Sequence, residues 1–320
     1  MRLIESKAEL LPWNPGIEGI YKTIELAGRT AYHSQDKITP DSAKDFVDRM
    51  IKSKHGAALE HGTVYLAIPY TDEETLSHYR GVAGKYNEVE FTRYSKVTMM
   101  RGTHNYVTTN YRVLVENNWL DDLQYLCSPT EFHEKRYTMR FTCSRAIAQE
   151  LTRHRVFSFL MESQRYVNYS KEKHGGEITF IIPSWIDRNK EPNTEAEVAW
   201  LDAMKKAEGA YLDMVNGIIR KGIVVMPADE KLTPQQARDV LPNATKTELI
   251  MTGFSSDWRH VMDLRLFGKT GAPHPDMVDL MKKAQKVMQE AGIWEDIMGK
   301  PSKFEDTFDE NNVGTLIGRD

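Results

Sequence analysis

Strand-like and helix-like segments are segregated along this chain rather than alternating one by one. Runs of β-branched, aromatic or alternating apolar residues predict strands, and apolar stripes of helical period predict helices. The expected strands lie at residues 63–70, 106–108, 111–115, 136–143, 178–182 and 246–252. The expected helices lie at residues 15–34, 41–54, 144–153, 194–222, 234–240, 255–266 and 275–291. This order favours an α+β fold, a mixed sheet with flanking helices, over a doubly wound parallel sheet.

No repeat, low-complexity block or Gly/Pro/Ser-rich linker divides the 320 residues. We therefore expect one domain over residues 1–320, ending in an irregular acidic tail at residues 301–320. No apolar run approaches the ~20 residues of a membrane span, and the N-terminus has no signal-peptide pattern. We expect a cytoplasmic protein with no membrane partner. Cys127 and Cys143, the two cysteines, are too few for a disulfide framework or a cysteine-based zinc site.

Positive charge is concentrated in one segment of a chain whose formal net charge is −4. Residues 135–171 hold eight Lys or Arg against two Glu, and RHR at 153–155 is followed, seven residues on, by SQRY at 163–166. Guanidinium groups bind phosphate or uracil-like carbonyl oxygens two at a time, and apolar residues interleave these charges. An anion pocket is therefore favoured over a solvated face, the commoner role of arginine-rich helix ends. If the RHR tripeptide is extended, its arginines face one side and its histidine the other.

Other familiar site patterns are absent or incomplete in the sequence. GKT at 268–270 resembles the end of a phosphate-binding P-loop, but Asp263 stands where the first glycine belongs. No GxGxxG follows an expected strand, which argues against a Rossmann dinucleotide site. His55 and His61 could reach one metal ion, but no third ligand is evident, so we predict no metal site.

Three further segments carry polar side chains that could join the arginine cluster. They are HGAALEH at residues 55–61, ARDVLP at 237–242 and WRHVMDLR at 258–265. Each segment by itself is explained more readily by a core histidine or a surface ion pair than by a binding site.

Taken together and in this order, RHR-x7-S at 153–163 and the three segments resemble the signature of the flavin-dependent thymidylate synthases, a family also called ThyX. The similarity covers residues 15–68 and 144–292 in outline, and residues 70–140 look like an insertion relative to compact members. The resemblance implies a mixed α+β homotetramer whose active sites are assembled from several subunits. It implies a methyltransferase that converts dUMP to dTMP, with methylenetetrahydrofolate as one-carbon donor and NADPH-reduced FAD as hydride source.

By position, the resemblance assigns two sets of residues. Those expected to contact FAD are His55, Ala57, Arg153, His154, Arg155, Phe254, Ser255, Ser256 and His260. Those expected to bind dUMP are Glu150, Leu151, Thr152, Arg153, Met161, Glu162, Ser163, Gln164, Arg165, Arg238 and Arg265. Arg265 matches the arginine that sits against the uracil ring and favours its ionisation, so it is the expected catalytic residue. A guanidinium at that edge stabilises the anion in which uracil C5 is nucleophilic.

Some positions depart from the family pattern. Leu160 and Met161 stand where many members have Asn-Glu, and Glu150 stands where a glutamine is frequent. The role of Glu150, a substitute carboxylate role for Glu162, and the preferred folate tail all stay open. No histidine lies at an obvious orienting distance from Ser163, so we expect this hydroxyl to donate a hydrogen bond to the nucleotide rather than act as a nucleophile.

Two other functions use the same basic segment. A non-catalytic nucleotide or RNA-binding module is the weaker hypothesis, because the chain is acidic overall. A flavoprotein that methylates uracil within RNA differs only in substrate. Classical thymidylate synthases add a cysteine thiolate to uracil, and neither Cys127 nor Cys143 has the Pro-Cys-His setting expected for that role.

Overall fold

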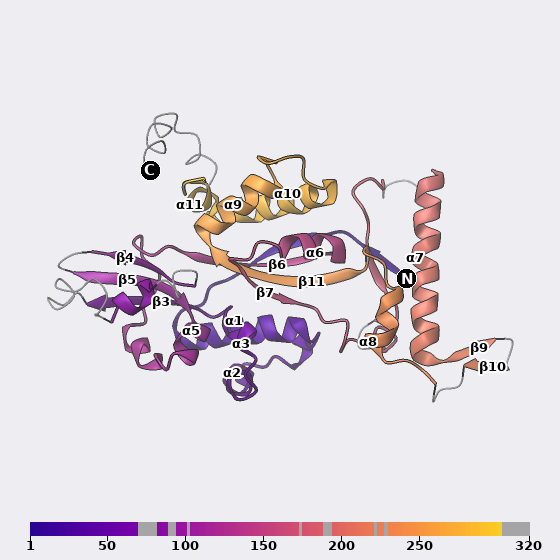
Figure 1. The fold of residues 1–320 in the computed structure, drawn as a ribbon, viewed down its shortest axis with the longest axis horizontal. Helices are drawn as coiled ribbons and strands as arrows, with labels where there is room; N and C mark the ends of the chain where they lie inside the picture. Colours follow the sequence, from indigo (N-terminus) through magenta and orange to yellow (C-terminus); the bar gives the residue numbers. More distant parts are fainter. Residues whose placement is uncertain are drawn as a thin grey trace, which may run out of the picture.

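The computed structural model describes residues 1–69, 82–88, 94–100, 103–172, 175–187, 194–220, 223–226 and 230–302 (Figure 1). Its helices are α1 (Gly16–Ala31), α2 (Ser42–Lys52), α3 (Gly56–Leu59), α5 (Tyr111–Glu116), α6 (Arg145–Leu151), α7 (Glu195–Asn216), α8 (Pro234–Ala237), α9 (Ser255–Arg265), α10 (Pro275–Glu290) and α11 (Trp294–Met298). Its 3-10 turns are η1 (Gln35–Lys37), η2 (Gly84–Asn87), η3 (Leu120–Tyr125) and η5 (Arg238–Val240). Its strands are β1 (Arg2–Ile4), β2 (Lys7–Leu11), β3 (Thr63–Pro69), β4 (Lys96–Met99), β5 (His104–Asn110), β6 (Arg136–Ser144), β7 (Ser158–Met161), β8 (Thr179–Ile181), β9 (Ile218–Arg220), β10 (Ile223–Met226) and β11 (Lys246–Phe254).

Two antiparallel sheets organise the described chain. One has four strands in the order β2-β6-β11-β7, and the other has three in the order β3-β5-β4. Figure 1 shows α9, α10 and α11 on one side of the four-stranded sheet and α1, α2 and α3 on the other. β1 pairs parallel with β8, and β9 pairs antiparallel with β10. This mixture of helices and sheets confirms the expected α+β fold.

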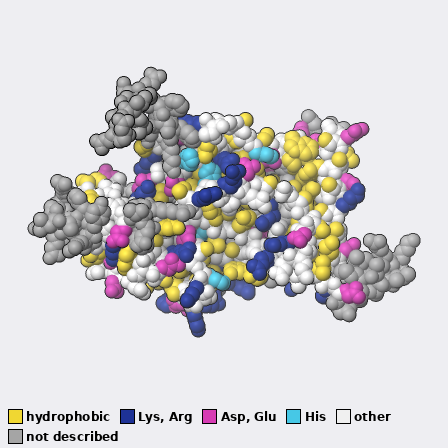
Figure 2. All heavy atoms as spheres, viewed as in Figure 1, with side chains coloured by type: hydrophobic (Ala, Val, Ile, Leu, Met, Phe, Trp, Pro, Cys, Tyr) yellow, Lys and Arg dark blue, Asp and Glu magenta, His cyan; other side chains and the backbone are white. Residues whose placement is uncertain are grey.

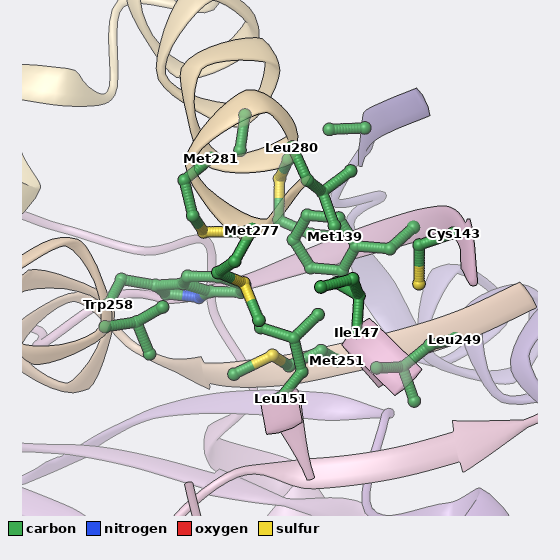
Figure 3. Packing of buried hydrophobic residues seen from close by; sticks show 14 of the residues in the cluster. Met139, Cys143, Ile147, Leu151, Leu249, Met251, Trp258, Met277, Leu280 and Met281 are labelled. Carbon is green, nitrogen blue, oxygen red and sulfur yellow. The ribbon is translucent and has the colours of Figure 1, made fainter. Parts of the chain in front are cut away.

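The main core lies between the four-stranded sheet and the helices above it. Met139 and Phe141 of β6 face this core, and the antiparallel register places Met251 and Leu249 of β11 directly opposite them. All four are fully buried, as the two-residue repeat of a strand dictates for one covered face. Figure 3 shows the side chains of α9 and α10 that pack over them: Trp258, Met277, Leu280 and Met281. The start of α9 is thereby anchored to the sheet.

Two further hydrophobic clusters complete the packing. One joins α1, α2 and α3 to the three-stranded sheet, and includes Ile24, Val47 and Val107. The other joins α7 and α8 to the chain around β8, and includes Tyr211 and Phe180. Residues 303–320 and parts of the expected insertion at 70–140 lie outside the described residues, so the division into one domain, insertion and tail stays a prediction.

Most expected elements form, with two clear differences. Residues 111–115, expected as a strand, form most of helix α5 because Asn110 caps it, its side-chain oxygen accepting a hydrogen bond from the Val113 amide at 3.2 Å. The long helix expected to reach residue 222 ends at Asn216, where Gly217 adopts a positive φ of 87°. The short strands β1, β2, β4, β7, β9 and β10 were not predicted.

We expect Gly253→Ala to destabilise the protein by about 1–3 kcal/mol, because it overpacks the core under α9. A Cβ at Gly253 would lie 2.3 Å from the ring of Phe157. That ring packs edge-on against Trp258, with 4.8 Å between the ring centroids. Gly209→Ala is the matched control: it lies in α7 with nothing within 4 Å of an added Cβ and should stabilise by about 0.5–1 kcal/mol. Urea unfolding measures both changes. Equal midpoints for the two variants would contradict this packing.

Candidate functional site

The turn at residues 152–157 is held beside the start of α9 by strand pairing. Ser144, the last residue of β6, lies opposite Lys246, the first residue of β11. α6 therefore begins at the start of β11, and β7 enters the sheet with Ser158 opposite Thr252, near the end of β11. β11 runs directly into α9. The RHR tripeptide between α6 and β7 thus meets the face of α9.

A cavity of about 580 Å³, which we call the arginine pocket, opens between this turn and the loop after α9. Its lining residues are Arg153, His154, Arg155, Val156, His260, Leu264, Arg265, Thr270, Gly271, Ala272 and Pro273. The lining contains three arginines and two histidines but no carboxylate. Figure 2 shows Lys, Arg and His side chains gathered over α9 on the visible face. Such a concentration of positive charge favours an anionic ligand.

Arg265 is the central hydrogen-bond donor of the arginine pocket. Its Nε donates to His154 Nε2 at 3.1 Å, its Nη1 to Glu150 Oε2 at 3.1 Å, and its Nη2 to the Glu150 carbonyl at 3.3 Å. Because Nε2 accepts, a neutral His154 carries its proton on Nδ1. The carboxylate of Glu150 is therefore the ion-pair partner of Arg265. This pairing orients the guanidinium and partly neutralises its positive charge.

The RHR tripeptide forms a turn rather than an extended strand. The extended conformation on which the predicted side-chain directions depended is therefore absent. Arg153 and Arg155 are nevertheless exposed, and His154 is buried. The His154 ring lies 6.2 Å from that of His260, at an interplanar angle of 79°. The turn thus presents two arginines at the surface and places its imidazole against α9.

The second half of the basic motif, residues 163–166, lies at the other end of β7; we call it the serine loop. The Ser163 amide donates to the Ala31 carbonyl at the end of α1 (2.9 Å), and Ser163 Oγ accepts from the Arg165 amide (3.3 Å). Arg165 is exposed, with its guanidinium 5.4 Å from the Tyr166 ring. The four residues of β7 alone span roughly 10 Å. Within one chain, the RHR turn therefore lies against α9, whereas the serine loop lies against the end of α1.

Arg238 lies on the side of the serine loop and not in the arginine pocket. It begins η5, directly after Ala237, and is half-buried. Ala237 shares a hydrophobic cluster with Val167 and Tyr169, which follow the serine loop in sequence. The structure thus places Arg238 on the element that packs against this segment.

Glu162 is held in a buried ion pair. Its Oε2 accepts from Lys246 Nζ at 2.8 Å and its Oε1 accepts from the Tyr169 hydroxyl at 3.0 Å. Burial lowers the pKa of Lys246, but Glu162 and Glu248 outweigh it and raise that pKa above its usual range. Glu162 is thus a fixed anchor between β7 and β11 rather than an uncommitted acid.

Several assigned residues lie away from the arginine pocket in this chain. His55 and Ala57 are exposed at the start of α3. Phe254 and Ser255 are buried at the junction of β11 and α9, and the Ser256 amide donates to Glu134 Oε1 at 3.2 Å. The remaining nucleotide-assigned residues are a buried Leu151, a half-buried Thr152 and Met161, and a buried Gln164.

The loop at 270–273 lines the arginine pocket and was not predicted as part of a site. Gly268 and Gly271 adopt φ of 65° and 139°, conformations that favour glycine. A Cβ at Gly268 would meet the Gly271 carbonyl oxygen at 3.0 Å. The glycine and proline content of 268–273 is the signal by which the sequence marks this loop.

His61, the second histidine of the 55–61 segment, is part of the core. It is fully buried, with Nδ1 2.8 Å from Thr252 Oγ1, whereas His55 is exposed. Burial, aided by the nearby charge of Arg136, lowers the pKa of His61 to about 3. Across the described residues, no three His, Cys, Asp or Glu side chains are grouped to hold a metal ion. In the same part of the chain, no helix is long and apolar enough to cross a membrane.

A family described as "Thymidylate synthase complementing protein" has a model that matches residues 94–291, more than half of the chain. A flavin-dependent thymidylate synthase of Corynebacterium glutamicum is 24% identical over 262 residues, which cover 79% of this chain and 70% of that protein. One of Corynebacterium efficiens is 37% identical over 124 residues, covering 38% of this chain and 46% of that protein.

Two solved structures align over nearly the whole chain with low similarity. The UMP/dUMP methylase PolB from Streptomyces cacaoi, bound with 5-Br UMP, is 13% identical with a TM-score of 0.42, over 93% of this chain and 95% of that one. Thymidylate Synthase X from Helicobacter pylori, with FAD and dUMP, is 13% identical with a TM-score of 0.36, over 92% of this chain and 100% of that one.

We expect His61 to make the protein acid-labile. Its folded pKa of about 3 lies below the 6.5 of an exposed histidine, so the stability it contributes is complete above pH 6.5 and falls as the pH drops toward 3. His61→Gln should reduce the slope of the unfolding free energy against pH between 6 and 4 by up to ~1.4 kcal/mol per pH unit. The exposed His55→Gln is the matched control and should keep the wild-type slope. Equal slopes in wild type and His61→Gln would refute the burial effect.

Proposed function

We propose, since the chain belongs to the thymidylate synthase complementing protein family, that it is a flavin-dependent thymidylate synthase. It would methylate dUMP to dTMP, with methylenetetrahydrofolate as one-carbon donor and NADPH as reductant. The observation that carries the proposal is the arginine pocket, whose lining joins the RHR tripeptide to His260 and Arg265 without a single carboxylate.

The arginine pocket fits the diphosphate and ring of FAD. Arg153 and Arg155 are exposed donors for phosphate oxygens, and guanidinium forks match such oxygens two at a time. A volume of about 580 Å³ lies in the usual range for cofactor sites. His154 and His260 offer imidazole edges to the same ligand. FAD bound there and reduced by NADPH would supply the hydride of the reaction.

Arg265 is the proposed catalytic residue. Glu150 and His154 accept from three of its N–H groups, so the guanidinium is oriented before substrate binds. A fixed guanidinium at the uracil edge stabilises the ring anion in which C5 is nucleophilic, and preorganised charge of this kind needs no rearrangement in the transition state. Glu150 then acts as a positioning residue, which accounts for an acid close to an anion site.

The nucleotide phosphate is the proposed ligand of the serine loop and Arg238. Arg165 is exposed, Ser163 offers its hydroxyl, and Arg238 lies on the element that packs beside them. Because β7 holds these groups apart from Arg265, one chain would supply the two halves to different active sites. We therefore propose that a second copy of the chain completes each site, as in the homotetramer that the resemblance implies.

The proposed activity is tested on purified protein. It should show the visible absorbance of bound flavin, oxidise NADPH faster when dUMP is added, and form dTMP with methylenetetrahydrofolate. Transfer RNA in place of dUMP should give no methylated product. A protein that takes up no added FAD and forms no dTMP would refute the proposal.

Arg265→Ala should lower kcat by roughly 10²–10³-fold, as expected when one donor to a developing anion is removed. FAD should stay bound, because Arg153 and Arg155 are unchanged. Arg265→Lys keeps the charge without the fork and should recover only part of the rate. Single-turnover formation of dTMP and the flavin spectrum measure the two effects. Wild-type turnover in Arg265→Ala would remove its assigned role.

The shared site predicts complementation between inactive variants. Arg165→Ala/Arg238→Ala should mainly raise the KM for dUMP, since a phosphate grip acts alike in ground and transition states. At low dUMP concentration this double variant and Arg265→Ala should each be nearly inactive. When subunits of the two variants are mixed after mild dissociation, part of the activity should return. Some active sites then combine an intact Arg265 from one subunit with an intact Arg165 and Arg238 from the other. Mixed oligomers with no gain would mean that one chain supplies both halves.

A further inference from the structure

A second cavity, of about 670 Å³, lies between the end of α1, η1 and α2; we call it the basic groove. Its lining residues are Arg29, Tyr32, His33, Ser34, Lys37, Phe46, Arg49, Met50, Lys52, Ser53 and His55. No carboxylate belongs to this lining. Figure 2 shows Lys and Arg side chains gathered over α2, apart from those over α9.

Three cations of the basic groove are available to a ligand. Arg29 is neutralised by Glu25, whose Oε1 accepts from its Nη2 at 2.9 Å and from its Nε at 3.1 Å. Lys37, Arg49 and Lys52 are exposed, and within the described residues none of them takes part in an ion pair. Three like charges around one cavity repel one another unless an anion lies between them.

The charges of α2 are sorted between its faces. Arg49 and Lys52, three residues apart and so on one face, line the basic groove. Asp48 does not line the groove, and its Oδ2 pairs with Lys44 Nζ at 2.6 Å. Arg49 also lies 5.7 Å from the ring of Phe46, which supports its stem on the groove side. The helix therefore presents cations to the groove and keeps its ion pair away from it.

The basic groove adjoins residues of the proposed active site. Tyr32 lines the groove, and its ring lies 5.7 Å from that of Tyr166 in the serine loop. His55, assigned to the flavin, lines the groove as well. A ligand held at the serine loop or at the flavin could therefore extend into the groove without leaving the protein surface.

We infer that the basic groove binds the anionic tail of a cosubstrate, a short chain of carboxylates or phosphates, through Lys37, Arg49 and Lys52. This inference rests on the proposed function, because it concerns the cosubstrates of that reaction. Two of them carry such a tail: the folate, through its γ-linked glutamates, and NADPH, through its phosphates. The cavity volume lies in the range of small-ligand sites, so it holds a short segment of either.

Direct binding is the first test, and it does not depend on turnover. Calorimetry on FAD-loaded protein would compare a tetra-γ-glutamate peptide with adenosine 2′,5′-bisphosphate. One of the two should bind wild type and the matched control Lys44→Ala alike. Arg49→Ala/Lys52→Ala should bind it about fivefold or more weakly, as expected for the loss of two exposed charge contacts. Binding of neither probe to wild type, or equal binding to all three proteins, would overturn the inference.

Kinetics then identify the source. If the groove holds the folate tail, wild type should prefer pentaglutamyl over monoglutamyl methylenetetrahydrofolate, and the double variant should lose that preference while its KM for NADPH stays unchanged. If it holds NADPH, the double variant shows the reverse. Loss of bound FAD in the double variant would instead assign the groove to the flavin and overturn the inference. A wild type that forms no dTMP would refute the proposed function on which the inference rests, whereas a wild type that forms dTMP but binds neither probe would refute the inference alone.

Discussion

The antiparallel pairing of β6 with β11 is the constraint on which the rest of the structure depends. Their nine-residue register brings Met139 and Phe141 opposite Met251 and Leu249 and so creates the buried face that α10 covers. The same two strands run directly into α6 and α9. Because each helix starts at a fixed end of a shared ladder, the polar groups they carry are placed by main-chain hydrogen bonds rather than by flexible connections.

The arrangement of charge follows from this frame. α6 returns along the sheet before β7 enters it, so the RHR turn faces α9 while the serine loop leaves toward α1. Two acids close to these cations are engaged: Glu150 with Arg265, and Glu162 with Lys246. Buried or half-buried carboxylates of this kind fix the geometry of their partners. The arginine pocket and the basic groove are thus both acid-free at their linings.

Separation of the two motif halves connects the fold to the proposed assembly. Arg265 lies with His154 before β7 and Arg165 lies after it, and we propose that a neighbouring copy presents the missing half to each nucleotide. Activity would then depend on association of subunits as well as on folding. The basic groove, adjoining the serine loop through Tyr32, would extend such a site toward the tails of its cosubstrates.

The sequence by itself determined the fold class, most helices and the basic motif, because apolar periodicity and clustered arginines are local signals. It misjudged residues 111–115, since a single cap from Asn110 outweighs their β propensity. It also could not show that Glu150 pairs with Arg265, or that residues 153–155 and 163–165 point to different places. The first is a contact between residues 115 positions apart, and the second results from the short strand β7 between the two halves of one motif. Tertiary packing decides both, and no local pattern in the sequence reports it.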